Sequence, residues 1–179
     1  MVCIYLATGF EEVEAVTILD LIRRAGIEAK FVSITGEIEV VGAHGITILA
    51  DALFEGMNYE NCKMIILPGG MPGTINLAKH VELTKKINSF VKEGKYLAAI
   101  CAAPMILGQM GLLEGKRATI YTGMEKYLDG AVFINNRVVT DGNIITSQGP
   151  GTAMEFAIKL VEILKDEKTS TELRRSLVL

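Results

Sequence analysis

The stretch KYLAAICAAPMILG, Lys95 to Gly108, joins an apolar run of strand length to a helix-forming segment, and Cys101 stands at the junction. A strand that turns abruptly into a helix strains the backbone of the turning residue and exposes its side chain above the sheet. Such a turn packs tightly, and alanines surround Cys101, while Pro104 suits a first helical turn. We therefore predict a nucleophile elbow, with a strand over 96–100 and a helix over about 102–110.

The rest of the chain repeats this alternation of apolar runs and helical periods. The pattern predicts strands at 2–7, 28–34, 63–70 and 144–147, shorter strands near 118–121, 131–134 and 137–140, a hairpin over 37–49, and helices at 11–25, 82–92 and 152–165. Fully apolar strands that alternate with helices are typical of a parallel sheet covered on both faces. No linker or repeat interrupts the pattern, so we predict one α/β domain over residues 1–179.

The spacing of apolar residues also predicts which helix faces point to the core. In the first long helix these residues are Val13, Val16, Leu19 and Ile22, and in the last they are Met154, Ala157, Ile158, Val161 and Leu164.

The amino-acid composition and charge of the chain argue against several classes of binding partner. Half of the 179 residues are apolar, which makes disorder improbable on physical grounds, and the net charge is only −3 with no block of basic residues. We therefore expect neither nucleic acid nor a membrane surface as a partner. Residues 96–113 carry no charge, but glycines and a proline interrupt them, so a buried strand and helix explain them better than a membrane span. The first twelve residues do not resemble a signal peptide.

Cysteine and histidine usage points to a reducing cytoplasm. The three cysteines form no C-x-x-C pair, which disfavours a disulfide framework or a zinc site. Cys3 lies inside the first strand and is interpreted as core, whereas Cys62 is expected to be partly exposed and incidental. Only His44 and His80 are available as histidine ligands, so we predict no metal site.

Loops that follow parallel strands meet at the carboxyl edge of the sheet, where α/β proteins bind ligands. Three segments qualify here: Thr8 to Glu14, Gly69 to Gly73, and Cys101. Their convergence is a physical reason to examine Cys101 as a functional residue.

At a helix N-terminus, free N–H groups and the helix dipole favour a thiolate over a thiol. An ordinary thiol, with a pKa of about 8.5, is only a few per cent ionised at pH 7, and a pKa of roughly 5 to 6 would make Cys101 almost fully thiolate. We predict a reactive cysteine on this basis. The alternative is a plain core residue, because cysteine is often simply buried.

Two further motifs contain groups that could assist a reaction at Cys101. In LPGGMPG, residues 67–73, the backbone N–H of Gly70 could join that of Ala102 as an oxyanion hole beside Cys101, although a simple turn is the other interpretation. GFEEVEA, residues 9–15, places three acids in a first helical turn, where acids stabilise the dipole. Glu14 is the acid expected to be partly buried, and it could hold a proton or only cap the helix.

With these motifs in order, the sequence resembles the ThiJ/PfpI superfamily over essentially its whole length. Within it, the chain is similar to the small branch that contains the parkinsonism-associated protein deglycase and its bacterial relatives. The segments that carry the resemblance are GFEEVEAV, LIRRAGI, ILPGG, NLA, AAICAAP, TSQGPGT and EFA.

The resemblance implies a flavodoxin-like three-layer sandwich of the class I glutamine amidotransferase type, assembled as a homodimer. It makes Cys101 the nucleophile, Glu14 the acid that hydrogen-bonds its sulfur, and Gly70 and Ala102 the oxyanion donors. It also places four further residues near the site or at a dimer contact: Gly69, Arg24, His44 and Tyr121.

Several departures from the superfamily pattern restrict the function. Many relatives have a histidine where this chain has Tyr121, which leaves the proton work to Glu14, and His44 stands where some have an arginine. Ala102 replaces the histidine typical of protease-like branches, which argues against a peptidase. No histidine follows His80, which excludes an amidotransferase.

The resemblance therefore implies a cofactor-free, glyoxalase- or deglycase-like enzyme that acts on methylglyoxal, glyoxal or early protein glycation adducts. The alternative is a non-catalytic redox sensor or stress-protective chaperone, whose Cys101 oxidises to sulfinic acid. A role in thiamine biosynthesis follows only from the family label and ranks last.

Overall fold

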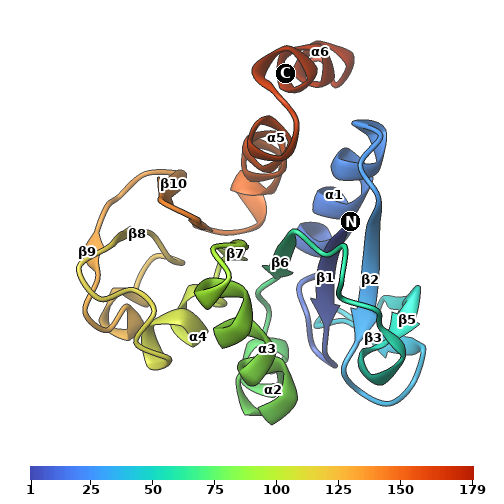
Figure 1. Cartoon of the computed structure of the whole chain (residues 1–179), viewed down its shortest axis with the longest axis vertical. Coiled ribbons are helices and arrows are strands. Elements are labelled where there is room, and N and C mark those ends of the chain that lie inside the picture. The colour runs from blue at the N-terminus through green and yellow to red at the C-terminus, as the bar shows by residue number, and fades with distance from the viewer.

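Seven strands form the central sheet of the computed structural model, which describes residues 1–179 (Figure 1). They are β1 (Val2–Leu6), β2 (Ala29–Ser33), β5 (Ala52–Leu53), β6 (Met64–Leu67), β7 (Tyr96–Ile100), β10 (Val138–Asp141) and β11 (Ile144–Ser147). Their order across the sheet is β10-β11-β7-β6-β1-β2-β5. Every pair is parallel except β10 with β11, so the sheet is mostly parallel and flavodoxin-like, as predicted.

Helices cover both faces of this sheet and complete the three predicted layers (Figure 1). The helices are α1 (Glu12–Arg24), α2 (Gly73–Lys79), α3 (Val81–Lys92), α4 (Pro104–Gln109), α5 (Ala153–Leu164) and α6 (Glu167–Ser176). Side chains of α1, α5 and α6 pack in one hydrophobic cluster, and side chains of α2, α3 and α4 pack in the other.

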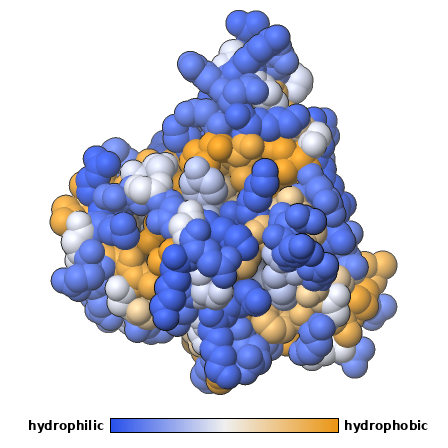
Figure 2. All heavy atoms as spheres, viewed as in Figure 1, coloured by the Kyte–Doolittle hydropathy of each residue, from blue (hydrophilic) through white to orange (hydrophobic).

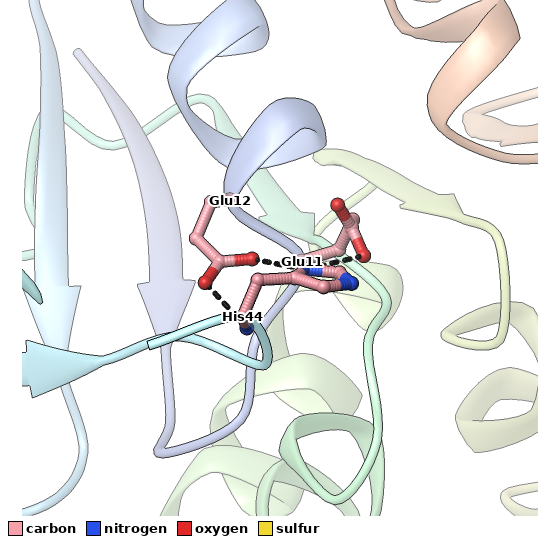
Figure 3. A group of neighbouring side chains, drawn as sticks. All are labelled: Glu11, Glu12 and His44. Atoms are coloured by element: carbon pink, nitrogen blue, oxygen red, sulfur yellow. Dashed lines mark hydrogen bonds and ion pairs between the residues drawn. The ribbon is translucent and has the colours of Figure 1, made fainter. Parts of the chain in front are cut away.

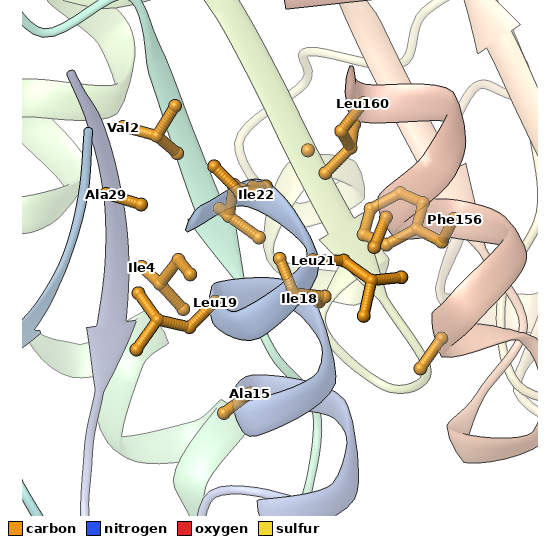
Figure 4. Close-up of a cluster of buried hydrophobic side chains, with 14 of the residues drawn as sticks. Val2, Ile4, Ala15, Ile18, Leu19, Leu21, Ile22, Ala29, Phe156 and Leu160 are labelled. Atoms are coloured by element: carbon orange, nitrogen blue, oxygen red, sulfur yellow. The ribbon is translucent and has the colours of Figure 1, made fainter. Parts of the chain in front are cut away.

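Successive side chains of β1 point to opposite faces of the sheet, so this strand contributes residues to both clusters. Val2, Ile4 and Leu6 enter the cluster under α1 and α5, whereas Cys3 and Tyr5 enter the cluster under α2 and α3. Figure 4 shows the first cluster, where apolar side chains of β1, α1 and α5 meet. A strand buried on both faces must be apolar throughout, which explains the unbroken run at the start of the chain.

Two small sheets lie outside the central one. β3 (Glu39–Val41) and β4 (Thr47–Leu49) pair as the predicted antiparallel hairpin. β8 (Arg117–Ala118) and β9 (Val132–Phe133) pair in parallel, so the strands expected near 118–121 and 131–134 are shorter than predicted. No helix has both the length and the apolar character that crossing a membrane requires.

The predicted helix faces need correction at three residues. Val13, Val16 and Met154 were assigned to the core, but their exposed fractions are 54%, 43% and 47%. The face of α1 that meets the sheet instead carries Ala15 and Ile18, two positions after Val13 and Val16. An i, i+3 pattern of apolar residues fits more than one helix face, and packing selects among them.

The prediction for Cys62 is also wrong. Its side chain is buried in the second hydrophobic cluster beside Cys3, because the turn that precedes β6 folds under the start of β1. The assignment of Cys3 to the core is confirmed.

Candidate active site

Cys101 directly follows β7 and has a positive φ of 62°, a left-handed conformation that non-glycine residues rarely adopt. Its N–H donates to the Ser147 carbonyl at 3.0 Å, and its carbonyl accepts from the Tyr121 N–H at 2.9 Å. These two bonds hold the turn in place. The strained backbone conformation of Cys101 itself costs about 1 to 3 kcal/mol. The predicted elbow geometry is confirmed, although α4 begins only at Pro104 and has six residues, so its dipole contribution is small.

Gly69 lies against both predicted catalytic side chains. A β-carbon added to Gly69 would stand 2.6 Å from Cys101 Cβ, 3.0 Å from Cys101 Sγ and 3.0 Å from Glu14 Oε2. Only glycine leaves room for the thiol and the carboxyl group to approach each other here. The structure thus gives the first glycine of the ILPGG segment a steric reason to be glycine.

Glu14 comes from the first turn of α1 and is fully buried. Its Oε2 accepts the Gly69 N–H at 2.7 Å, while Oε1 has no hydrogen-bond partner. Burial raises the pKa of Glu14 to about 7, and the nearby Glu11 adds to this, whereas the Gly69 N–H and the Cys101 thiol act in the opposite direction. At neutral pH this carboxyl group is therefore poised to give or take a proton.

Cys101 and Glu14 cannot both ionise easily in this setting. Burial and the Glu14 carboxylate raise the pKa of the Cys101 thiol to about 12, and backbone N–H groups of Ala102 and Gly70 only partly offset this. The expectation of a lowered thiol pKa is thus wrong for the state in which Glu14 is ionised. Because the two groups share one pocket, they titrate as a pair that loses its first proton near pH 7 and retains the second well above neutral pH.

The backbone N–H groups of Gly70 and Ala102 both act on the Cys101 sulfur, since each lowers the pKa of the thiol. Gly70 has a positive φ of 90°, and a side chain there would overlap the backbone of Glu11. The Glu11 N–H also donates to the Gly69 carbonyl at 2.9 Å. The loops after β1 and β6 are therefore interlocked, and this contact fixes the Gly70 backbone, which carries one of the two predicted donors.

Glu12 ties the β3–β4 hairpin to the start of α1 (Figure 3). Its carboxylate accepts the backbone N–H groups of His44 at 2.7 Å and Ile46 at 3.3 Å, and Oε2 lies 2.8 Å from His44 Nδ1. Burial raises the pKa of Glu12, but these hydrogen bonds outweigh it and leave the pKa lowered. The contact with Glu12, together with the charge of Glu11, raises the pKa of His44.

The side chains of Glu11, Glu12 and His44 form the one cluster in the chain with the residue types and spacing to hold a metal ion. One ligand atom each from Glu11, Glu12 and His44 lies within 4.8 Å of the others (Figure 3). The Glu12 carboxylate already forms hydrogen bonds with two backbone N–H groups and with the His44 ring. We therefore interpret it as a structural clamp that holds the hairpin against α1. Sequence analysis did not anticipate this clamp, because it joins residues more than thirty positions apart.

The remaining predicted residues divide into two groups. Tyr121 lies next to Cys101 through its backbone bond, and its ring packs against Gly149. Arg24 lies at the far end of α1, where it pairs with Asp20 at 2.6 Å. Arg24 lies ten positions after Glu14 in the same helix, about 15 Å along the axis, so the structure does not bring Arg24 to the site.

Residues 1–163 match the sequence profile of the DJ-1/PfpI family. The chain is 40% identical over 180 residues to protein DJ-1 homolog B of Arabidopsis thaliana, covering 99% of this chain and 41% of that protein. It is 34% identical over 166 residues to the glutathione-independent glyoxalase DJR-1.2 of Caenorhabditis elegans (92% and 88%), and 34% identical over 168 residues to a deglycase of Pyrococcus abyssi (92% and 99%). The chain spans less than half the length of the Arabidopsis proteins it matches.

Solved structures give the same result at the level of the fold. Toxoplasma gondii DJ-1 in an oxidized form superposes with a TM-score of 0.95 at 34% identity, covering 99% of this chain and 97% of that chain. Drosophila melanogaster DJ-1beta superposes with a TM-score of 0.94 at 34% identity and the same coverage.

Proposed function

The chain belongs to the DJ-1/PfpI family, and from this premise we propose that it is a glyoxalase- or deglycase-like enzyme. Its substrates are reactive carbonyl compounds such as methylglyoxal and glyoxal, or the early adducts that they form on proteins. We assign the chemistry to Cys101 and Glu14, without a cofactor or a metal ion, in a reducing cytoplasm.

One observation carries this proposal. A buried carboxyl group with a pKa near 7 lies beside the sulfur of a cysteine in a strained turn, and Gly69 leaves room for the two groups to approach. A proton donor next to a nucleophile is what addition to an aldehyde needs. The names of the C. elegans and P. abyssi relatives support the same reaction class and favour turnover over a purely redox-sensing role.

The first step follows from the shared proton of the pair. The Glu14 carboxylate takes the proton from the Cys101 thiol as the sulfur adds to the aldehyde carbon of methylglyoxal and forms a C–S bond. The resulting oxyanion is stabilised by the N–H groups of Gly70 and Ala102 and takes up the Glu14 proton. The product of this step is a hemithioacetal, and Glu14 is left as a carboxylate.

The second step uses Glu14 as a base. Its carboxylate removes the hydrogen from the former aldehyde carbon, which gives an enediol, and returns it to the neighbouring carbon. The hydroxyl proton moves to the neighbouring oxygen, so that the hemithioacetal becomes a thioester of a hydroxy acid. Water then cleaves the thioester, releases lactate and restores the Cys101 thiol. The whole reaction consumes one molecule of substrate and one of water, and it needs no oxidant or reductant.

We further propose that the protein is a homodimer that uses α1 and the start of α5 as its contact. Val13, Val16 and Met154 are large apolar side chains exposed on these helices, and Figure 2 shows apolar surface in this region bordered by hydrophilic residues. A groove between the two helices is lined in part by Val13, Ala153 and Met154. Exposed apolar patches of this kind are typical of protein interfaces.

The test of the enzymatic proposal is lactate formation from methylglyoxal by the purified protein, with a chelator present and glutathione absent. We expect turnover by the wild-type protein and none by Cys101→Ser. The matched control is Cys62→Ala, which removes a cysteine outside the site and should leave the rate unchanged. Equal lactate formation by Cys101→Ser would contradict the proposal.

A further inference from the structure

Cys3 and Cys62 form a second thiol centre, separate from Cys101. Their sulfur atoms lie 3.0 Å apart, and both side chains are buried. This separation is shorter than ordinary contact between sulfur atoms and about 1 Å longer than the bond of about 2.05 Å in a disulfide. A small movement of either side chain therefore suffices to join them.

The hydrogen bonds around this pair assign each sulfur a different chemical role. The Cys62 sulfur lies 3.4 Å from the Met64 carbonyl, to which its S–H donates, so the Cys3 S–H is free to donate to Cys62. The contact with Cys3 lowers the pKa of Cys62, with smaller help from the Met64 backbone, the N-terminal amine and Lys95, whereas the same contact and burial raise the pKa of Cys3. Cys62 is thus the first to ionise and the better nucleophile.

The pair lies at the opposite edge of the sheet from the candidate active site. Cys3 is at the start of β1, and Cys62 lies in the turn before β6, whereas Cys101 follows the carboxyl end of β7. The turn is held to the amino terminus by two bonds, Lys63 N–H to the Met1 carbonyl at 3.0 Å and the Met1 amine to the Asn61 carbonyl at 3.2 Å. Its neighbouring residues Glu60, Asn61 and Lys63 are exposed, so local opening of one turn uncovers Cys62.

We propose that Cys3 and Cys62 are a redox modification site that forms a reversible intramolecular disulfide when the protein meets hydrogen peroxide. The Cys62 thiolate attacks the peroxide, which forms a sulfenic acid and releases hydroxide. The Cys3 sulfur then attacks Cys62 Sγ, loses its proton and displaces the sulfenic oxygen, which leaves as water. Overall, two thiols and one peroxide give one disulfide and two waters, and a small thiol reductant reverses the reaction.

The disulfide would join the amino-terminal strand to a segment 59 positions later in the chain. Closing a loop of this size restricts the unfolded chain strongly, and the corresponding rise in melting temperature for a protein of this length is about 10 °C. Peroxide would therefore stabilise the fold at the end of the sheet opposite to Cys101.

The test is peptide mapping after peroxide treatment, because trypsin places the three cysteines in separate peptides, 1–23, 31–63 and 96–116. The Cys101→Ala protein, treated with peroxide and then alkylated in denaturant, should yield peptide 1–23 linked to peptide 31–63, with two hydrogens lost and full reversal by dithiothreitol. Its melting temperature should rise by about 10 °C relative to the reduced sample. Cys62→Ala in the same background should show neither change, and circular dichroism checks that this variant folds.

Two results would overturn the proposal. One is complete alkylation of both Cys3 and Cys62 after prolonged treatment with excess peroxide. The other is addition of oxygen atoms to either residue without a link between the two peptides. Because the experiment uses protein without Cys101, its outcome is independent of the enzymatic proposal.

Discussion

Replacing Glu14 with Gln should stabilise the protein at pH 8.5 and leave its stability almost unchanged at pH 4.5. The side chains have the same shape, and the Gln oxygen can still accept the Gly69 N–H that Glu14 Oε2 accepts at 2.7 Å. The variant lacks only the buried negative charge. Its effect therefore measures what ionisation of Glu14 costs the folded state.

The magnitude follows from the raised pKa of Glu14, about 7 in the fold against an ordinary value of 4.5. A carboxyl group whose pKa is raised by folding contributes stability that is fully present below pH 4.5 and is lost as the pH rises through 7. The difference of about 2.5 pKa units corresponds to about 3 kcal/mol, or about 6 to 12 °C in melting temperature for a chain of this length. The Gln variant should not lose this amount.

Urea unfolding of both proteins at several pH values between 4.5 and 8.5 is the assay. The difference in unfolding free energy, variant minus wild type, should grow by about 3 kcal/mol across this range. Glu12→Gln is the matched control, because hydrogen bonds lower the pKa of Glu12, so this variant should destabilise the protein at pH 8.5, where Glu14→Gln stabilises it. A Glu14→Gln effect that stays constant with pH would refute the reasoning.

Three further substitutions test the geometry of the site, the Glu12 clamp and the proposed dimer contact. Gly69→Ala places a carbon 2.6 Å from Cys101 Cβ, and turnover of methylglyoxal should fall by about 100-fold in a steady-state assay. Glu12→Ala leaves the N–H groups of His44 and Ile46 without their acceptor, and hydrogen exchange at both amides should accelerate about tenfold. Val16→Glu charges the proposed contact on α1, and sedimentation should show a monomer where the wild-type protein sediments as a dimer.

The sequence was sufficient for those features that depend on local pattern. Unbroken apolar runs predicted the parallel strands, and the apolar run that ends in Cys101 predicted the strained turn now seen at φ 62°. Two helices were missed for opposite reasons. α2 begins at Gly73 within a glycine- and proline-rich segment that resembles a loop, and α6 is so polar that Leu173 is its one buried apolar residue.

Contacts between distant segments could not be predicted from local pattern. The Glu12 clamp on the hairpin spans 32 positions, and the approach of Cys62 to Cys3 spans 59. Each depends on how a turn packs against a helix or strand that is distant in the sequence. The pKa of Cys101 is a similar case, because the position of the turn indicated a stabilised thiolate, whereas burial and the Glu14 charge reverse the direction of the shift.

The most direct test of the central claim is detection of the bond between Cys101 and the substrate carbon. The wild-type protein is incubated with methylglyoxal that carries carbon-13 at the aldehyde position, and the protein-bound carbon is observed by NMR during turnover. The account predicts a hemithioacetal or thioester signal that is absent from the Cys101→Ser protein. A signal of equal strength in both proteins would contradict it, because the carbon would then be held by a group other than Cys101.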